Sequence, residues 1–307
     1  MSRRGLILFL ALGVAWGIPY LLIKVAVGEL SPAMVVFSRS ALASVLLLPL
    51  AFARGDVAPV LRRWPVLLIY TLVEIIVPWY CLSSAEEQLP SSIAGLLIAS
   101  VPLVSIGVAF LLGRGVRLSL TNWLGIAVGM GGVAAIVGLD VGGSHIGPLA
   151  KMAVVAIGYA VGPAILGHWL SDVPAIGVVA LSLTITAVVY VPIVLLSGGF
   201  PDAWPSAKVI SSVVTLAVVC SATAFLLMIA LIAQIGPVRT TAITYVNPAV
   251  AMLAGAIFLN EKLTVWAILG LVLVLVGSYL VTHRKRNVVE EEFVLIAESE
   301  APAVVEC

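Results

Sequence analysis

Apolar runs about as long as a membrane is thick follow one another along almost the whole chain. Residues 5–27 and 174–196 are two examples, and together they contain a single charged side chain. An α-helix needs about 20 apolar residues to cross the roughly 30 Å hydrocarbon core of a bilayer. With 62% hydrophobic and 10% charged residues, a soluble protein of this length could not bury so much apolar surface. The chain is therefore predicted to be an all-α integral membrane protein.

Ten of these runs are predicted to be transmembrane helices, joined by short connections that carry turn residues. Their predicted bounds are 5–27, 32–53, 64–85, 91–112, 121–139, 147–169, 174–196, 208–233, 239–259 and 264–282. The first run is expected to be retained as a span, because it is too long for a signal peptide and no small-residue cleavage site follows it. The charged tail, residues 284–307, is expected to be disordered and solvated rather than a partner-binding motif.

Other classes of protein are disfavoured by what the sequence lacks. The net charge of +1 gives no basic field for nucleic acid. The three histidines do not show the H-E-x-x-H spacing, and there is no G-x-S-x-G elbow, no Walker A loop and no acidic cluster for Mg²⁺. We therefore expect no metal ion, no cofactor and no enzyme activity. A membrane-embedded sensor or scaffold that signals through the tail stays open as an alternative.

The distribution of Lys and Arg predicts the orientation, because cytoplasmic loops are enriched in both. With the N-terminus inside, eleven basic residues fall on the inner face and three on the outer face. The inner residues are Arg3, Arg4, Arg54, Arg62, Arg63, Arg114, Arg117, Arg239, Arg284, Lys285 and Arg286. The outer residues are Lys151, Lys208 and Lys262. Both termini are therefore predicted to be cytoplasmic.

The two halves of the chain repeat each other at offsets of 144 to 148 residues. GIPYLLIK (17–24) matches VGPAILGH (161–168), and the stretch 89–114 matches 236–261 in its two prolines and following glycine. Matches that recur in order at nearly one offset indicate an internal duplication. Each half holds five spans, an odd number, so the second half enters the membrane from the opposite side. Inverted repeats are typical of secondary transporters whose substrate site lies at the midplane.

The order of these elements resembles the EamA-type branch of the drug/metabolite transporter superfamily. The matching features are the early Trp16-Gly17, Arg39 in the second span, and the stretch 247–281 with its proline, small residues, Glu261 and glycines. The resemblance covers residues 5–283 and implies two EamA-like five-helix repeats, at 5–139 and 147–283. It also implies a bacterial inner-membrane carrier, in many relatives an exporter of amino acids, other metabolites or drugs. Arg114 stands where the second half has Glu261, so the acidic residue occurs in one half only.

Glu74 lies in the middle of an otherwise apolar run, where a carboxylate costs roughly 2.5–3.5 kcal/mol on insertion scales. At about 100° per residue, Tyr70, Thr71, Pro78 and Cys81 lie within about 60° of it. This polar stripe is expected to face the bundle interior. The opposite side carries Leu72, Ile75, Ile76 and Trp79.

Three interpretations of Glu74 are open. It is a protonated, hydrogen-bonded group; or it pairs structurally with Lys24 or Arg39; or it binds a cationic substrate group or a proton during transport. The third predicts proton coupling and makes Glu74 the main candidate coupling residue. For Lys24 and Arg39 a structural role is favoured.

Proline positions predict breaks that would shape and gate a site: Pro19, Pro78, Pro102, Pro163 and Pro248. Asn247 precedes Pro248, so a side-chain amide and an unpaired carbonyl occur together. Thr244 shares that face of the ninth span. Packing through small and hydroxyl residues is the simpler explanation for the rest of this face.

Aromatic residues deep in the spans are the last candidates for a site. Trp16, Tyr80, Tyr159 and Tyr245 would line a central cavity for a partly apolar metabolite, and core packing explains them equally well. The predicted partners are the lipid bilayer and a small-molecule substrate. An uncoupled facilitator or exchanger is the alternative to a coupled exporter, and the sequence leaves open whether the protein is a monomer or a homodimer.

Overall fold

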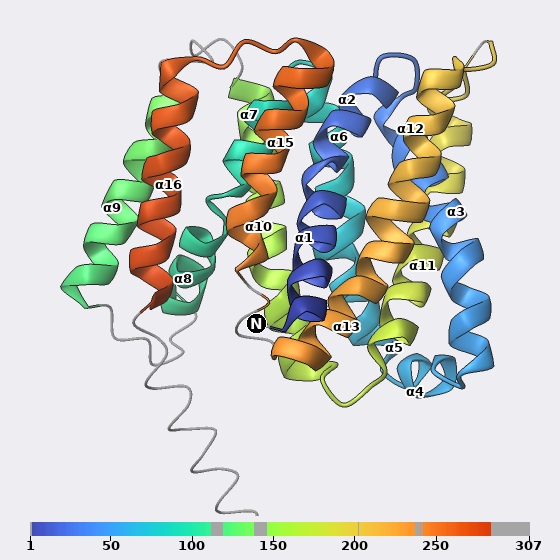
Figure 1. The fold of residues 1–307 in the computed structure, drawn as a ribbon. Helices are drawn as coiled ribbons and strands as arrows, with labels where there is room; N and C mark the ends of the chain where they lie inside the picture. Colours follow the sequence, from blue (N-terminus) through green and yellow to red (C-terminus); the bar gives the residue numbers. More distant parts are fainter. Residues whose placement is uncertain are drawn as a thin grey trace, which may run out of the picture.

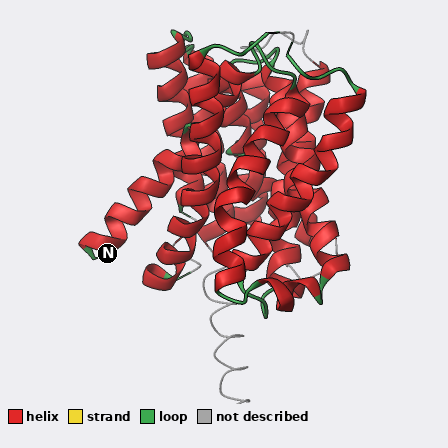
Figure 2. Cartoon of the chain, turned by 90° about the vertical axis from the view of Figure 1, so that its right-hand side faces the viewer, coloured by secondary structure: helices red, strands yellow, loops and turns green. Residues whose placement is uncertain are grey.

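The computed structural model describes residues 2–111, 119–137, 146–201, 203–236, 240 and 242–283. All regular elements within these residues are helices (Figures 1 and 2). Seven helices are long and apolar enough to cross a membrane, and three shorter apolar helices accompany them: 120–135, 243–259 and 265–281. The fold is thus the predicted all-α membrane type. The predicted tail, 284–307, lies outside the described residues.

Helices of the first half coincide with the first five predicted spans. Three of these spans consist of consecutive helical segments. The elements are α1 (Arg3–Gly17), α2 (Pro19–Ala26), α3 (Pro32–Ala53), the short α4 (Val57–Leu61), α5 (Trp64–Thr71), the π-helix η1 (Leu72–Ile76), α6 (Val77–Glu86), α7 (Ser91–Ile98), α8 (Val101–Leu111) and α9 (Leu120–Ala135).

Helices of the second half coincide with the remaining five predicted spans, and one of these spans is segmented. The elements are α10 (Ile146–Trp169), α11 (Ala175–Leu196), α12 (Ala207–Ala217), the π-helix η3 (Val218–Thr223), α13 (Ala224–Ile235), α15 (Ile243–Leu259) and α16 (Val265–His283).

Side-chain caps and prolines explain where several helices begin. Ser31 and Ser206 accept hydrogen bonds from backbone N–H groups three residues on, at 3.2 and 3.4 Å, and so cap α3 and α12. Pro19 begins α2, where its missing N–H costs nothing. Asn260 ends α15 in the left-handed conformation, with φ 53°.

Two helix pairs lie at opposite edges of the bundle, and both join one half of the chain to the other (Figure 1). One pair is α9 with α16, and the other is α3 with α11. Glycines bring the backbones of α9 and α16 into contact: a Cβ at Gly125 would lie 2.8 Å from the carbonyl oxygen of Gly277. Close backbone approach through small residues is a typical helix contact in membranes.

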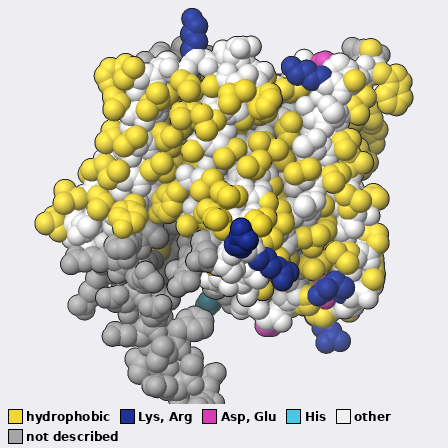
Figure 3. Space-filling view, in the orientation of Figure 1, with side chains coloured by type: hydrophobic (Ala, Val, Ile, Leu, Met, Phe, Trp, Pro, Cys, Tyr) yellow, Lys and Arg dark blue, Asp and Glu magenta, His cyan; other side chains and the backbone are white. Residues whose placement is uncertain are grey.

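The sides of the molecule are apolar. In Figure 3 hydrophobic side chains cover the visible face, and Lys and Arg side chains gather near its upper and lower ends. Large exposed hydrophobic residues include Leu196, Ile146 and Val45, which are 88%, 75% and 70% exposed. A soluble monomer does not expose so continuous an apolar surface, and a lipid-facing surface does.

Candidate functional site

Two π-helical segments interrupt equivalent spans of the two halves. Segment η1 starts at Leu72 and η3 starts at Val218, 146 residues later (218 − 72 = 146), which is the spacing of the sequence repeat. A π-turn holds an extra residue and leaves a carbonyl without its α-helical partner. In η1 the Ile76 carbonyl accepts a hydrogen bond from the Tyr190 hydroxyl at 2.8 Å. The same backbone irregularity therefore occurs at repeat-related positions of the two halves.

Glu74 is in η1, and its carboxylate packs against α10. A Cβ at Gly162 would overlap the Glu74 Oε2 atom and lie 2.7 Å from its Cδ. Oε2 is enclosed and has no hydrogen-bond partner among the described residues. Tyr70, about one helical turn before Glu74, is buried, and Tyr159 is partly buried in α10. Gly162 thus makes the space that a buried carboxylate occupies between two spans.

The polar stripe around Glu74 is buried as predicted from its spacing. Tyr70 is 5% and Thr71 0% exposed, and the Thr71 hydroxyl donates to the Leu67 carbonyl and contacts the Ser182 hydroxyl, at 2.7 and 2.9 Å. Ile75 and Trp79, expected on the opposite side, are buried as well. The prediction assumed 100° per residue along the whole span. The extra residue of the π-helical segment η1 changes the direction in which the following side chains point.

Arg39 and Lys24 do not bond to Glu74. The Arg39 Nε donates to the Ser221 hydroxyl of η3 at 2.8 Å, and its guanidinium carbon lies 3.7 Å from the centre of the Trp79 ring. Lys24 Nζ donates to the Glu86 carbonyl oxygen at 2.5 Å. Among the described residues, ion pairs are confined to Arg54–Asp56 and Arg63–Asp172. Arg39 is therefore a buried cation held by a hydroxyl and an aromatic ring.

Glu86 is a buried acid that the sequence analysis missed. Its side chain is 0% exposed, and neither carboxylate oxygen has a hydrogen-bond partner among the described residues. The predicted span ended at residue 85, and the run Glu86-Glu87-Gln88 reads as a solvated connection. Its spacing of seven from Trp79, which places both on one helical face, is the signal that could have indicated burial.

The remaining predicted residues occupy several environments. Asn247 has a buried Oδ1 without a described partner. Trp16 makes an edge-to-face contact with Phe225, with ring centres 6.0 Å apart. Tyr80 is 41% exposed and stacks on Tyr190, with ring centres 6.5 Å apart. Thr244 and Tyr245 are partly buried in α15.

Three of the five prolines mark segment boundaries. Pro19 begins α2, Pro78 lies in the first turn of α6, and Pro102 lies in the first turn of α8. Pro163 and Pro248 are inside the continuous helices α10 and α15. Neighbouring helices in a membrane bundle commonly tolerate a proline without interrupting the helix.

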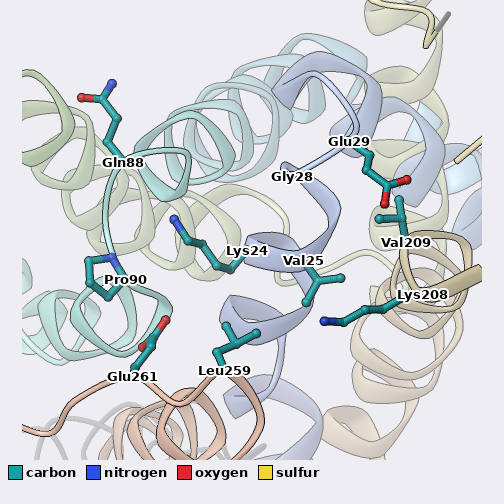
Figure 4. Close-up of a pocket in the computed structure, with 10 residues that line it drawn as sticks. All are labelled: Lys24, Val25, Gly28, Glu29, Gln88, Pro90, Lys208, Val209, Leu259 and Glu261. Carbon is teal, nitrogen blue, oxygen red and sulfur yellow. The ribbon is translucent and has the colours of Figure 1, made fainter. Parts of the chain in front are cut away.

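A cavity of about 550 Å³ opens at one end of the bundle. It is lined by Lys24, Val25, Gly28, Glu29, Gln88, Pro90, Lys208, Val209, Leu259 and Glu261 (Figure 4). In Figure 4 Lys24 extends toward Gln88 and Pro90, and Glu261 lies beside Pro90. The carbonyl of Glu86, to which Lys24 bonds, adjoins this cavity.

Two carboxylates of the cavity wall cap helices of the other half. Glu261 accepts hydrogen bonds from the backbone N–H groups of Ser91 and Ser92, at 2.8 and 2.9 Å, at the start of α7. Glu29 accepts one from the Ser206 N–H at 2.7 Å, at the start of α12. Burial alone would raise the pKa of Glu261, but the bonds from Ser92 and Ser91 lower it below its usual value. The Ser206 N–H lowers the pKa of Glu29 in the same way.

Comparison with known proteins identifies the family. The model of the EamA-like transporter family matches residues 3–138 and 148–283. The chain belongs to the EamA-like transporter family. It is therefore a multi-pass membrane transporter of the drug/metabolite transporter type, as its sequence resemblance predicted.

Relatives of similar length support this assignment. The chain is 30% identical to the uncharacterized inner membrane transporter YedA of Escherichia coli (strain K12), over 88% of this chain and 90% of that protein. It is 25% identical to the uncharacterized transporter YvbV of Bacillus subtilis (strain 168), over 93% of both. A solved crystal structure with 20% sequence identity superposes with a TM-score of 0.66, over 94% of this chain and all of the other. That likeness establishes the fold alone.

Proposed function

We propose that this EamA-family protein is a secondary transporter that exports a small metabolite, amino acid-like or drug-like, by alternating access. Its ten spans form two inverted five-helix halves in a bacterial inner membrane, with both termini in the cytoplasm. The support for this arrangement is the excess of Lys and Arg on the predicted inner side and the two separate ranges matched by the family model.

Two contacts between the halves support the inverted repeat, because each recurs among the described residues with the two halves exchanged. Contact of α6 with α10 corresponds to contact of α12 and α13 with α2 and α1. Contact of α1 with α15 corresponds to contact of α10 with α8. Alternating access in inverted-repeat carriers uses such equivalence, since each half can adopt the conformation of the other.

Glu74 carries the proposal for the coupling step. Its Oε2 is enclosed at mid-span, beside Gly162, without a hydrogen-bond donor among the described residues. In a low-dielectric site an ionised carboxylate without a partner is strongly disfavoured, so binding a proton or a substrate ammonium group is favourable there. In this proposal Glu74 takes up and releases a proton as the two halves exchange conformations.

Radiolabelled counterflow in proteoliposomes tests transport, with pooled amino acids, amines, organic acids and nucleosides as substrates. Exchange above that of empty liposomes is expected for at least one pool. With that substrate, Glu74→Gln should keep exchange but abolish accumulation driven by a pH gradient, because glutamine cannot titrate. Glu87→Gln, at an exposed acid directly after the end of α6, is the matched control and should behave as wild type. Wild-type pH coupling in Glu74→Gln would contradict the assignment.

A further inference from the structure

The first transmembrane span is bonded to the eighth at both of its ends. The first span consists of α1 and α2, and the eighth of α12, η3 and α13. At the cavity end the Ser206 N–H donates to the Glu29 carboxylate at 2.7 Å. At the opposite end the Ser2 hydroxyl donates to the Gln234 side-chain oxygen at 3.3 Å. In between, α2 packs against α12 and α1 packs against α13, so the two spans are in contact from end to end.

The third and sixth spans are joined in the same way. The third span consists of α5, η1 and α6, and the sixth is α10. At the cavity end the Lys151 ammonium donates to the Ser84 hydroxyl at 2.6 Å. At the opposite end Arg63 and Asp172 form an ion pair at 2.6 Å. In between, α10 packs against η1 and α6, and a Cβ at Gly158 would lie 2.5 Å from a backbone oxygen of η1. Each of the two span pairs therefore joins one half of the chain to the other.

Two of these bonds are related to each other by the sequence repeat. The Glu29–Ser206 bond and the Asp172–Arg63 ion pair are separated by a single offset, since 172 − 29 = 143 and 206 − 63 = 143. Each joins an acid that follows the first span of one half to a residue that precedes the third span of the other half. One of them lies at each end of the bundle, as an inverted repeat requires.

The other two bonds are repeat-related as well. Ser2 corresponds to Lys151, with 151 − 2 = 149, and Ser84 corresponds to Gln234, with 234 − 84 = 150. Bonds between exposed groups contribute little free energy each, so packing between the helices holds each span pair together and the bonds align its ends. We call the first and eighth spans the α1/α13 unit, and the third and sixth spans the α6/α10 unit.

The two units meet at the cavity end, where Lys24 bonds across their boundary. Among the described residues the main contact between the units is that of α2 with α6. Lys24 Nζ donates to the Glu86 carbonyl oxygen at 2.5 Å and lies 3.4 Å from the Glu87 carbonyl oxygen. A cation is favoured at a helix C-terminus, because the last carbonyls have no partner within the helix. Lys24 therefore holds α2 of one unit against the end of α6 of the other.

The repeat-related position in the second half lacks this bond. His168 of α10 corresponds to Lys24, since 168 − 24 = 144. Its side chain is exposed, and its ring contacts that of Trp169, with ring centres 4.7 Å apart. The ring makes no hydrogen bond to the described residues. The second half therefore packs without such a bond, which leaves the Lys24 bond free to serve a change of conformation.

We propose that the moving bodies of this carrier are the α1/α13 and α6/α10 units rather than the two repeats, and that the Lys24 bond to the end of α6 closes the space between the units at the cavity end. This inference rests on the proposed transport function and assigns its moving parts. Breaking the bond opens the cavity toward the interior of the bundle, and forming it again closes that end. Because a protein hydrogen bond that is lost is replaced by one to water, the bond can break in every transport cycle.

A reducible cross-link between the units tests whether they move apart. Counterflow of the pool that wild type exchanges is measured in proteoliposomes of the full chain. Gly28→Cys combined with Gln88→Cys places one thiol on each unit, at two exposed positions of the cavity wall, and leaves Lys24 intact. Joining the two thiols with a bis-methanethiosulfonate reagent should abolish counterflow, and reduction should restore it. Wild type treated in the same way accounts for reaction at the native cysteines.

Cross-links within a unit are the matched controls. Glu29→Cys with Ser206→Cys joins the α1/α13 unit at the cavity end, and Arg63→Cys with Asp172→Cys joins the α6/α10 unit at the opposite end. All four positions are exposed. Both cross-links should leave counterflow close to the untreated rate. If the two repeats were the moving bodies, both would stop transport, because each joins the first half of the chain to the second.

Two lysine variants test the closing bond itself. Lys24 and Lys151 both bond near the end of α6, but Lys24 belongs to the other unit and Lys151 to the same one. Ala85→Cys reports on this end of α6, because Ala85 is 0% exposed and shares a hydrophobic cluster with Ile23 of α2. Lys24→Met should raise its rate of labelling by a water-soluble maleimide at least about tenfold, because a charged hydrogen bond is lost. Lys151→Met should leave that rate near its original value.

The outcomes separate the inference from the function on which it rests. Counterflow that survives the Gly28–Gln88 cross-link would overturn the inference and leave transport standing. Loss of counterflow on both cross-links within the units would overturn it as well, in favour of the repeats as moving bodies. Equal labelling of Ala85→Cys with and without the Lys24 ammonium would show that this bond does not close the cavity end. Absence of exchange for every pool by folded wild type would overturn the proposed function itself. The labelling comparison needs no transport, so it decides the question even where a double variant is inactive.

Discussion

Segments η1 and η3 have the same backbone irregularity and different chemistry. Both are π-helical and start 146 residues apart, but η1 holds Glu74, without a described partner, and η3 holds Ser221, which binds Arg39. The comparison indicates that the duplicated fold provides a backbone break at one level of each half. The side chains then diverged, one toward a titratable group and the other toward holding a cation.

Filling the space beside η1 with a larger side chain should have the largest effect on stability and transport. Gly162→Leu places a side chain where Glu74 Oε2 now lies, and the overlap involves a buried carboxylate that has no other space. We expect overpacking and displacement of Glu74 to cost about 3 kcal/mol or more and to abolish transport. Yield of monodisperse protein and counterflow would measure this.

Gly107→Leu is the control for that substitution, because no atom lies within 4 Å of a Cβ at Gly107. Transport by Gly162→Leu at the wild-type rate would mean that Glu74 is not held against α10 as described.

Removing the Ser221 hydroxyl of η3 should have an intermediate effect on the stability of the protein. Ser221→Ala deletes the acceptor of the Arg39 Nε–H and leaves a buried charged donor without a partner. A hydrogen bond to a charged group contributes about 1.5–3 kcal/mol, and thermal unfolding in detergent should show a loss in that range. Ser211→Ala, at an exposed position of α12, should unfold like wild type. Unchanged stability of Ser221→Ala would show that Trp79 alone suffices to hold Arg39.

The carboxylates that cap α7 and α12 at the cavity allow a further comparison of the two halves. Removing one of these caps should have the smallest effect on stability. Glu261→Gln removes a charge that the start of α7 stabilises, so we expect a loss of about 0.5–1 kcal/mol near neutral pH, reduced by solvent screening. Because the pKa of Glu261 is lowered in the fold, its contribution is fully present above the usual value of 4.5. It is lost as pH falls through the lower, folded-state pKa.

Thermal unfolding of wild type and Glu261→Gln between about pH 3 and 8 would measure that dependence. The two curves should separate above about pH 5 and converge at the acid end. Curves that stay parallel down to the acid end would contradict a titrating cap. Glu29, which accepts a single backbone bond, provides the comparison within the other half.

The sequence predicted the positions of the apolar helices well, because hydropathy over about 20 residues depends on the solvent and hardly on tertiary contacts. It also predicted the buried stripe of Tyr70 and Thr71. It did not predict the π-turns, because these depend on partners such as Tyr190 that lie far along the chain. The burial of Trp79 was missed for the same reason.

Glu86 escaped prediction because its environment is assembled from other spans. Glu87 and Gln88, which follow it in sequence, are polar and exposed, while Lys24 of α2 donates to its backbone carbonyl at 2.5 Å. Applying the repeat offset of 146 residues to Glu74 gives Cys220, next to Ser221. The repeat would therefore have pointed to the segment of η3 whose Ser221 binds Arg39.

The glycine contact of α9 with α16 has a consequence for mutational tolerance. A Cβ at Gly132 would lie 2.7 Å from the carbonyl oxygen of Gly270, and one at Gly277 would lie 2.6 Å from the Gly129 backbone. A rotamer change elsewhere cannot relieve a clash with backbone, so even alanine forces the helices apart. In a saturation library these positions should accept no substitution at all, whereas Gly131, one residue from the seam with nothing within 4 Å, should accept many.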